Sequence, residues 1–251
     1  MSAATTARWA PIGLDELNEA AALQTRVDRK YALDSEEATR VLADLDPATR
    51  VLELDGQREL AYESVYFDTP DLLSYRLAAT GRRRRFKLRT RAYLDTDTAF
   101  LELKTRGGRS TTVKERIEYA IDDREVLTPE GREYTDDALG ELGIPNAERL
   151  DLVPTIVTRY DRMTLLLPEG DGRATVDTGL AWLTPQGAHL ERPRMTIIET
   201  KSGQAASALD RMLWAHGHRP DSISKFATGL AALTPDLPAN KWTRVLRRHF
   251  R

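Results

Sequence analysis

Charged and apolar side chains alternate strictly in the middle of the chain. Odd positions from 85 to 93 carry Arg, Lys, Arg, Arg and Tyr, and the positions between them carry Phe, Leu, Thr and Ala. A period of two is the spacing of a β-strand, whose successive side chains point to opposite faces. The segment is therefore predicted to be a strand with one basic face and one largely apolar face.

Two following segments, 99–104 and 111–119, continue the alternation after a polar turn and a Gly-Gly turn. Their charged residues again share a face within each segment: Glu102 with Lys104, and Lys114 with Arg116. Short, evenly patterned strands joined by tight turns are typical of an antiparallel meander. We therefore predict three neighbouring strands that present their basic side chains to the same side.

The rest of the chain mixes both periodicities. Further strands are predicted at 25–31, 62–67, 155–167, 173–177 and 195–201. Helices are predicted at 14–23, at 36–45 behind an Asp34-Ser35 cap, from Asp68-Thr69-Pro70 to Gly81, and at 135–142, 203–215, 222–233 and 241–250. The expected fold class is α+β, with a closed antiparallel β-barrel whose interior is polar and whose apolar outer faces are covered by flanking helices.

No internal repeat or clear linker divides the 251 residues. The predicted organisation is an N-terminal segment with a short helix (1–24), one barrel domain (25–233) and a basic C-terminal helix (234–251). A basic terminal helix is most simply a solvated one, and contact with an acidic membrane surface is the alternative.

Composition makes the charge pattern more informative. The chain has 37 Lys and Arg against 39 Asp and Glu, a net charge of −2, which argues against a general nucleic-acid-binding protein. Segment 82–116 nevertheless carries twelve basic and four acidic residues. Like charges that face each other on adjacent strands cost about 0.2–1 kcal/mol per pair. An ordinary solvated face would explain one such strand, but several together favour a lumen that binds a polyanion.

Several classes of site and location are excluded or disfavoured. The chain has no cysteine, and its histidines show no metal-ligand spacing. It shows neither a signal peptide nor an apolar run of the roughly 18 residues that cross a membrane. We expect a cytoplasmic protein without a transmembrane segment.

Two other short segments carry candidate chemistry. Glu199 and Lys201 lie two residues apart within an apolar run, where burial without a partner would be costly, so they are expected to meet a metal or a phosphate. A solvated edge strand is the alternative. Ser224 and Lys225 lie at a predicted helix start, which suits an anion, although Ser is also a common N-cap.

A set of short motifs occurs in a particular order: Lys30-Tyr31, Tyr66-Phe67-Asp68-Thr69-Pro70, Lys87-Leu88-Arg89-Thr90-Arg91, Glu102-Leu103-Lys104, Val113-Lys114-Glu115-Arg116, Tyr160-Asp161-Arg162, Asp177-Thr178, Glu199-Thr200-Lys201 and Ser224-Lys225-Phe226. Together they resemble the catalytic domain of the vacuolar transporter chaperone (VTC) polyphosphate polymerases, within the triphosphate tunnel (CYTH-like) superfamily. The resemblance runs from about position 26 to 230.

The resemblance implies roles for individual residues. Contacts with phosphate oxygens inside the tunnel are implied for Lys30, Arg89, Arg91, Lys104, Lys114 and Arg162, and less strongly for Arg173. Glu199 would hold a catalytic Mg²⁺ or Mn²⁺ with Lys201 beside it, and Ser224 and Lys225 would bind phosphate at one tunnel mouth. Asp177 would support the metal through water or organise Arg side chains, and a strand-end turn residue is the alternative.

One departure bears on the reaction. Hydrolytic members of the superfamily usually open with Glu-x-Glu-x-Lys, whereas this chain reads Arg26-Val27-Asp28-Arg29-Lys30. This departure disfavours hydrolysis, and the resemblance implies transfer of the γ-phosphoryl group of ATP to a growing polyphosphate chain. The implied partners are ATP and polyphosphate, with no nucleic acid and a possible membrane-protein partner. The alternatives are an inorganic or nucleoside triphosphatase, a non-catalytic polyphosphate-binding module, and an adenylate cyclase. The oligomeric state is left open.

Overall fold

The computed structural model describes residues 7–20, 27–106, 112–170 and 172–250. Its strands are β1 Ala10–Ile12, β2 Val27–Asp34, β3 Arg50–Leu52, β4 Leu60–Asp68, β5 Arg85–Tyr93, β6 Thr98–Arg106, β7 Thr112–Tyr119, β8 Val153–Leu166, β9 Arg173–Leu183, β10 His189–Arg192 and β11 Met195–Ser202. Its helices are α2 Leu14–Ala20, α3 Ser35–Ala43, α4 Leu73–Ala79, α5 Pro129–Leu142, α6 Ala208–Ala215, α7 Lys225–Leu233 and α8 Thr243–His249. The α+β class is confirmed. No helix in the described ranges is long and apolar enough to cross a bilayer.

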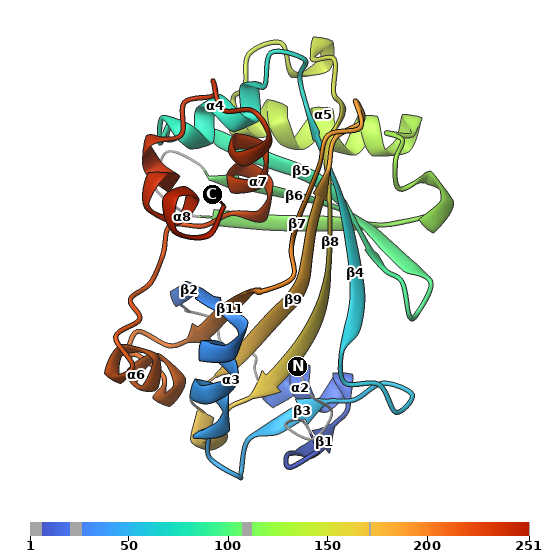
Figure 1. The fold of residues 1–251 in the computed structure, drawn as a ribbon. Helices are drawn as coiled ribbons and strands as arrows, with labels where there is room; N and C mark the ends of the chain where they lie inside the picture. Colours follow the sequence, from blue (N-terminus) through green and yellow to red (C-terminus); the bar gives the residue numbers. More distant parts are fainter. Residues whose placement is uncertain (1–6, 21–26, 107–111, 171, 251) are drawn as a thin grey trace.

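A single large sheet organises the molecule (Figure 1). Its main path runs β2-β11-β9-β8-β4-β5-β6-β7, and each neighbouring pair along this path is antiparallel. The predicted meander of three strands is β5-β6-β7. Figure 1 shows the sheet turning at β4, so that β5 to β7 run across the molecule while β8 and β9 run down it.

The prediction of a closed barrel is not confirmed. Within the described residues, β2 pairs only with β11 and β7 only with β6, so these two strands are the ends of the hydrogen-bonded path. The alternation of polar and apolar residues determines which side chains share a face. It contains no information on whether the first and last strands pair with each other. The pattern could therefore predict which side chains face the interior, but not whether the two edge strands close the sheet into a barrel.

Helices cover the apolar faces, as predicted. Phe86 and Leu88 of β5 are buried in one cluster with Leu139 of α5. At β2, β9 and β11, a second buried cluster joins the apolar residues of these strands to α3 and α6. The polar side chains of the alternating strands are left on the inner, concave side.

The C-terminal helices cover one end of this concave side. Phe226 of α7 stacks on Tyr66 of β4, with ring centroids 5.1 Å apart. Trp242 and Val245 extend the same buried cluster to the start of α8. The C-terminal segment therefore packs against the rest of the fold.

Several predicted boundaries differ for identifiable reasons. Helix α4 starts at Leu73 and not at Pro70, because the buried Asp68 carboxylate reaches past the turn to accept hydrogen bonds from the N–H groups of Ser74 and Tyr75. Helix α6 starts only at Ala208, behind a capping box of Ser207 and Asp210. Helix α5 starts earlier than predicted, behind the N-cap Thr128.

Strand β9 is longer than the predicted 173–177, and β10 was not predicted. The register between β8 and β9 shifts between Arg159 and Asp161, where β9 carries an extra residue near Gly179 at a φ of 60°. Such a bulge exchanges the two faces of a strand. The alternation therefore breaks at the point where the sequence pattern suggested that the strand ends.

Candidate anion-binding site

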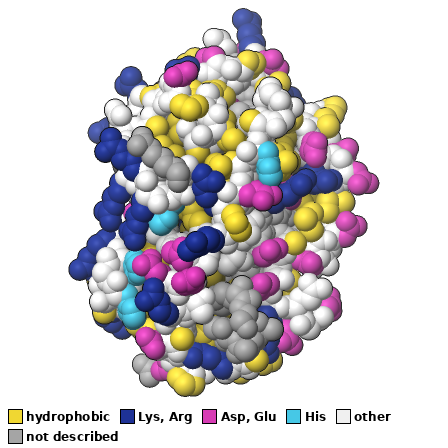
Figure 2. All heavy atoms as spheres, in the orientation of Figure 1, with side chains coloured by type: hydrophobic (Ala, Val, Ile, Leu, Met, Phe, Trp, Pro, Cys, Tyr) yellow, Lys and Arg dark blue, Asp and Glu magenta, His cyan; other side chains and the backbone are white. Residues whose placement is uncertain are grey.

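A cavity of about 650 Å³ lies on the concave side of the sheet. Its described lining contains four acidic residues and eleven basic ones: Lys30, Lys87, Arg89, Arg91, Lys104, Lys114, Arg116, Arg162, Arg173, Lys201 and Lys225. On the outer face in Figure 2, by contrast, Lys and Arg are interspersed with Asp and Glu. The near-neutral chain therefore concentrates positive charge inside its sheet.

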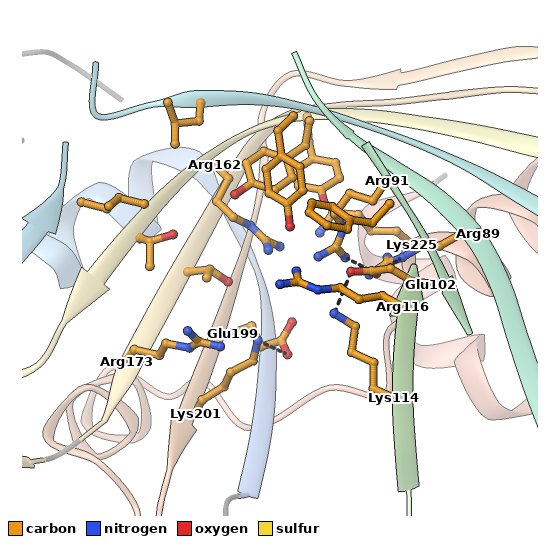
Figure 3. A pocket seen from close by; sticks show the side chains of 18 of the residues that line it. Arg89, Arg91, Glu102, Lys114, Arg116, Arg162, Arg173, Glu199, Lys201 and Lys225 are labelled. Carbon is orange, nitrogen blue, oxygen red and sulfur yellow. Dashed lines mark hydrogen bonds and ion pairs between the residues drawn. The ribbon is translucent and has the colours of Figure 1, made fainter. Parts of the chain in front are cut away.

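Eleven of the twelve site residues predicted from sequence line this cavity. They come from β2, β5, β6, β7, β8, β9, β11 and the start of α7, and Figure 3 shows the labelled side chains pointing into a common space. The twelfth, Asp177, contacts two lining residues from behind. Their roles in binding or catalysis stay predictions.

Glu102 of β6 organises one side of the cavity. Its side chain is only 2% exposed, and it accepts hydrogen bonds from Arg89 Nε at 2.9 Å and Lys114 Nζ at 2.7 Å. Burial alone would raise the pKa of this carboxyl, but the Arg89 and Lys114 charges hold the pKa below its ordinary value. An ionised Glu102 therefore fixes cations from β5 and β7 in place.

Asp177 of β9 organises a second group. The fully buried carboxylate accepts from Arg162 Nε at 2.6 Å and Nη2 at 2.8 Å, and it also pairs with Lys225 Nζ. The charges of Arg162 and Lys225 outweigh burial and lower the pKa of Asp177. Of the roles considered for Asp177, the geometry matches the organisation of basic side chains; a metal role for it stays a prediction.

Glu199 of β11 lies between Lys30 and Lys201, with N–O distances of 3.5 and 3.6 Å. Burial opposes its ionisation, yet the surrounding cations, Lys30 first, lower its pKa strongly. Unlike Asp177, Glu199 lines the cavity. Its carboxylate is therefore available to a cation that enters with a ligand.

The described residues contain no group of three or more His, Asp or Glu that could hold a metal ion. Asp28 lines the same wall as Glu199 and lies opposite Lys201 in the β2–β11 register. Mg²⁺ is commonly bound by one or two carboxylates together with substrate phosphates. This donor set fits a divalent ion shared with a phosphate chain and does not fit a cage made of protein ligands alone.

Several polar groups of the lining lack either a hydrogen-bond partner or an acidic partner. The Arg91 Nε atom is buried without a hydrogen-bond partner. Within the described residues, neither Lys87 nor Lys104 has an acidic partner within ion-pair distance, and burial together with nearby cations, Lys30 among them, lowers the pKa of both amines. Because buried donors and charges are normally paired, these groups indicate an anionic ligand.

The lining changes chemically along β5 and β6. Directly opposed residues share a face, and from one end of the two strands to the other these pairs are Arg85–Arg106, Lys87–Lys104, Arg89–Glu102, Arg91–Phe100 and Tyr93–Thr98. Successive pairs are about 7 Å apart along the strands. Leu60 lies two residues beyond Tyr62, the partner of Tyr93, and Leu14, Leu54 and Asp95 also line the cavity. The cavity therefore has a strongly basic end and an aromatic, aliphatic end.

Tyrosines hold the central arginines in position. The Arg162 guanidinium lies 5.1 Å from the Tyr62 ring centre and 5.2 Å from that of Tyr160. The Tyr66 hydroxyl accepts a hydrogen bond from Arg89 Nη1 at 2.9 Å. Cation–π contacts of this kind favour an ordered guanidinium.

Sequence reasoning had not assigned some of these residues to the site. Lys87, Glu102 and Arg116 share the strand faces of predicted residues, so the period-two pattern was sufficient to include them. Tyr62 and Tyr160 gave no comparable signal, because tyrosine on a strand is common in any sheet. Arg26, part of the motif that departs from the hydrolases, lies outside the described residues.

The model of the VTC domain family matches residues 25–234 of this chain. No curated protein shows significant sequence similarity. A putative adenylate cyclase from Vibrio parahaemolyticus is a solved structure similar to this chain at 13% identity and a TM-score of 0.37, over 84% of this chain and 87% of the other. A putative adenylyl cyclase from Hippeastrum, described as having a dominant triphosphatase activity, is similar at 15% identity and a TM-score of 0.46, over 81% and 94%.

Proposed function

Because this chain belongs to the VTC domain family, we propose that it is a triphosphate tunnel enzyme that transfers the γ-phosphoryl group of ATP to a growing polyphosphate chain. The observation that carries the proposal is the cavity lining, in which basic residues outnumber acidic ones by seven among the described residues. Arg and Lys side chains that recur at successive pairs along β5 and β6 suit a linear polyanion better than a compact one.

The gradient along β5 and β6 orients the substrate. The nucleoside of ATP lies toward Tyr93 and Leu60, where apolar area is available. The triphosphate extends toward the Arg89–Glu102 and Lys87–Lys104 pairs. Arg162 reaches the same space from β8 and offers the planar fork that matches phosphate oxygens.

Transfer requires an oxygen of the polyphosphate terminus to bond to the γ-phosphorus of ATP while the bond to the β–γ bridging oxygen breaks. ADP leaves with the bonding electron pair, and the chain becomes one phosphate longer. The attacking oxygen is already ionised, so the step needs no strong general base. Positioning and charge stabilisation, the principal means of catalysing phosphoryl transfer, are what fixed Arg89, Arg91 and Arg162 supply.

A divalent ion fits this arrangement at Glu199, with Asp28 nearby on the same wall. When bound, Mg²⁺ or Mn²⁺ would neutralise charge on the phosphate oxygens. Lys30 and Lys201 flank Glu199 and would bind the remaining oxygens of the same phosphates. Lys225 and Ser224 hold phosphate where α7 begins.

A triphosphatase is the second candidate, and one observation favours it. Asp28 retains a carboxylate in the slot where hydrolases have their second glutamate, and it lines the cavity. Hydrolysis would use water in place of the polyphosphate terminus. The two activities differ in their products and not in how they bind ATP.

The decisive experiment incubates the purified chain with ATP and either Mg²⁺ or Mn²⁺. Polymer is resolved on a gel stained for polyphosphate, and free phosphate is assayed in the same samples. We expect polymer and ADP without stoichiometric free phosphate, and loss of both products in Arg162→Met. Arg149→Gln, whose side chain is 81% exposed outside the cavity lining, is the control. Free phosphate without polymer would show that the chain is a triphosphatase and not a polymerase.

A further inference from the structure

A second, smaller pocket of about 240 Å³ lies at the basic end of β5 and β6. It is bounded by the two strands, the last residues of α4, the segment before α7, and Trp242. Its described lining contains five basic residues and no acidic one: Arg85, Lys87, Lys104, Arg106 and Lys241. This pocket is therefore purely cationic, unlike the main cavity with its carboxylates.

The two pockets are adjacent. Lys87, Lys104 and Ser224 line both of them. The Lys87 amine donates to the Ser224 hydroxyl at 3.0 Å, which places both residues at the boundary. The next pair along the strands, Arg85–Arg106, belongs only to the second pocket. The second pocket therefore lies next to the main cavity, in the direction in which the paired residues of β5 and β6 become fully basic.

The charges of the second pocket are not neutralised by the fold. Arg85 lies directly opposite Arg106, an arrangement that costs free energy. The hydrogen bonds made by Arg85 Nη1 and Lys241 Nζ go to the carbonyl oxygens of Arg82 and Ala78, at 2.7 and 3.4 Å. Within the described residues, none of the three cations Arg85, Arg106 and Lys241 has an acidic partner within ion-pair distance. Burial, then Arg106, lowers the pKa of Arg85, consistent with uncompensated positive charge.

We propose that this second pocket is a distal subsite for inorganic polyphosphate, which binds the part of a chain that extends beyond the main cavity and between the strands and the C-terminal segment. The inference rests on the proposed function and adds a direction to it: nucleoside at the Tyr93 end, growing polymer at the Arg85 end. A triphosphate occupies the main cavity alone. The subsite therefore gives long chains an affinity that short chains lack.

The experiment compares the affinities of two ligands, tripolyphosphate and long-chain polyphosphate, by calorimetry on the full chain. The variant is Arg85→Gln with Lys241→Gln. The matched control, Arg149→Gln with Arg194→Gln, removes the same charge from side chains that are 81% and 80% exposed and line neither pocket. Arg106→Gln alone is the second variant. Removing one member of a repelling pair should not unfold the protein, and thermal melting checks this.

In the pocket variant we expect about tenfold weaker binding of long-chain polyphosphate and less than about a twofold change for tripolyphosphate. The surface control should change both affinities little and equally. Two results would overturn the proposed distal subsite even if the wild type makes polymer. One is an equal loss of affinity for both ligands in the pocket variant, and the other is a pocket variant whose affinities match those of the control. The wild type could make no polymer and yet prefer long-chain polyphosphate, with the preference lost in the pocket variant. In that case the proposed reaction fails while the subsite stands. No binding of either ligand by the wild type would overturn both.

Discussion

Glu102, Asp177 and Glu199 each sit among several cations and have pKa values below those of ordinary carboxyls. They hold basic side chains in place before any ligand arrives. Leaving these side chains to solvent would require each ligand to order several long Arg and Lys side chains, at a cost of up to about 2 kcal/mol each. The carboxylates therefore contribute preorganisation, which the net charge of the cavity does not reveal.

Asp177→Asn should destabilise the protein by about 3 kcal/mol in urea unfolding at neutral pH, because it leaves Arg162 and Lys225 buried beside a neutral group. The folded-state pKa of Asp177 is lowered, so its contribution is present above the usual Asp pKa and is lost as pH falls. The difference between wild type and variant should therefore shrink in acid. Glu148→Gln, at an exposed ion pair, should change stability by less than about 1 kcal/mol. A difference that stays constant or grows in acid would contradict this assignment.

Triphosphate binding should take up protons at alkaline pH. Burial and neighbouring cations lower the pKa values of Lys87 and Lys104, and a bound anion favours their protonated forms. Affinity should therefore fall as pH rises through the lowered lysine pKa values. Calorimetry in two buffers of different ionisation enthalpy measures the uptake, and Lys87→Met should reduce it. Binding heats that do not depend on the buffer would show that these amines are protonated in the free protein.

How far single residues could be predicted depended on their strand faces. Alternation alone places Arg89, Arg91 and Lys114 on the basic faces of their strands, and the family resemblance supplied their predicted roles. The contact of Asp177 with Lys225, 48 positions later in the chain, has no local signature. It depends on how α7 packs across β8 and β9, which is a tertiary property.

At the scale of elements, helix α7 is positioned by a glycine. A Cβ at Gly229 would lie 2.1 Å from Cδ1 of the buried Trp182, whose indole N–H donates to the Lys225 carbonyl. This close approach places the helix against β9. Because Ser224 and Lys225 start the same helix, the packing at Gly229 also sets where they meet the cavity.

Two glycine-to-alanine substitutions in helices should have opposite effects. Gly229→Ala should destabilise the protein by about 1–3 kcal/mol through overpacking against Trp182, and should weaken triphosphate binding by displacing α7. Gly140→Ala, in α5 with nothing within 4 Å of the added Cβ, should stabilise it by about 0.5–1 kcal/mol. Chemical denaturation measures both. Equal effects would mean that backbone entropy, and not the close contact, dominates at Gly229.

The elements themselves were largely predictable where period and caps agree. Strands β5, β6 and β11 and the cap of α3 at Asp34 follow their sequence signals closely. The failures lie at β9, where a bulge breaks the alternation, at α4, where the Asp68 carboxylate acts seven residues along the chain, and at α6, where a capping box at Ser207 starts the helix later than predicted. Local patterns describe regular geometry and are least informative where it is interrupted.

For the whole molecule, the contrast between a net charge of −2 and a basic interior determines the response to ligands. Tripolyphosphate should raise the melting temperature, since it binds the folded cavity and has no equivalent site in the unfolded chain; at a hundredfold excess over its Kd the gain is about 2.7 kcal/mol. Sodium chloride at matched ionic strength should give a smaller shift. Equal shifts would indicate general screening of charge without a specific site.

Membership of the family was predicted from ordered short motifs and is confirmed by the match over residues 25–234. The prediction of a closed barrel is not confirmed, because no sequence motif shows whether the edge strands of the sheet pair with each other. The choice between polymer synthesis and hydrolysis depends on what attacks the γ-phosphorus. Asp28 and Glu199 are compatible with both reactions, so the products decide.

Strand β2, near the N-terminus, pairs along its whole length with β11, more than 160 positions later. During translation, the ion pair between Lys30 and Glu199 therefore cannot form until β11 has left the ribosome. Until then the basic faces of β5, β6 and β7 lack the opposite wall that shields them, close to ribosomal RNA that carries the same kind of charge as the proposed ligand. A chain interrupted before β11 would keep those cations without the carboxylate that completes the cavity. Completion of the cavity therefore depends on the synthesis of β11, as a consequence of the strand order.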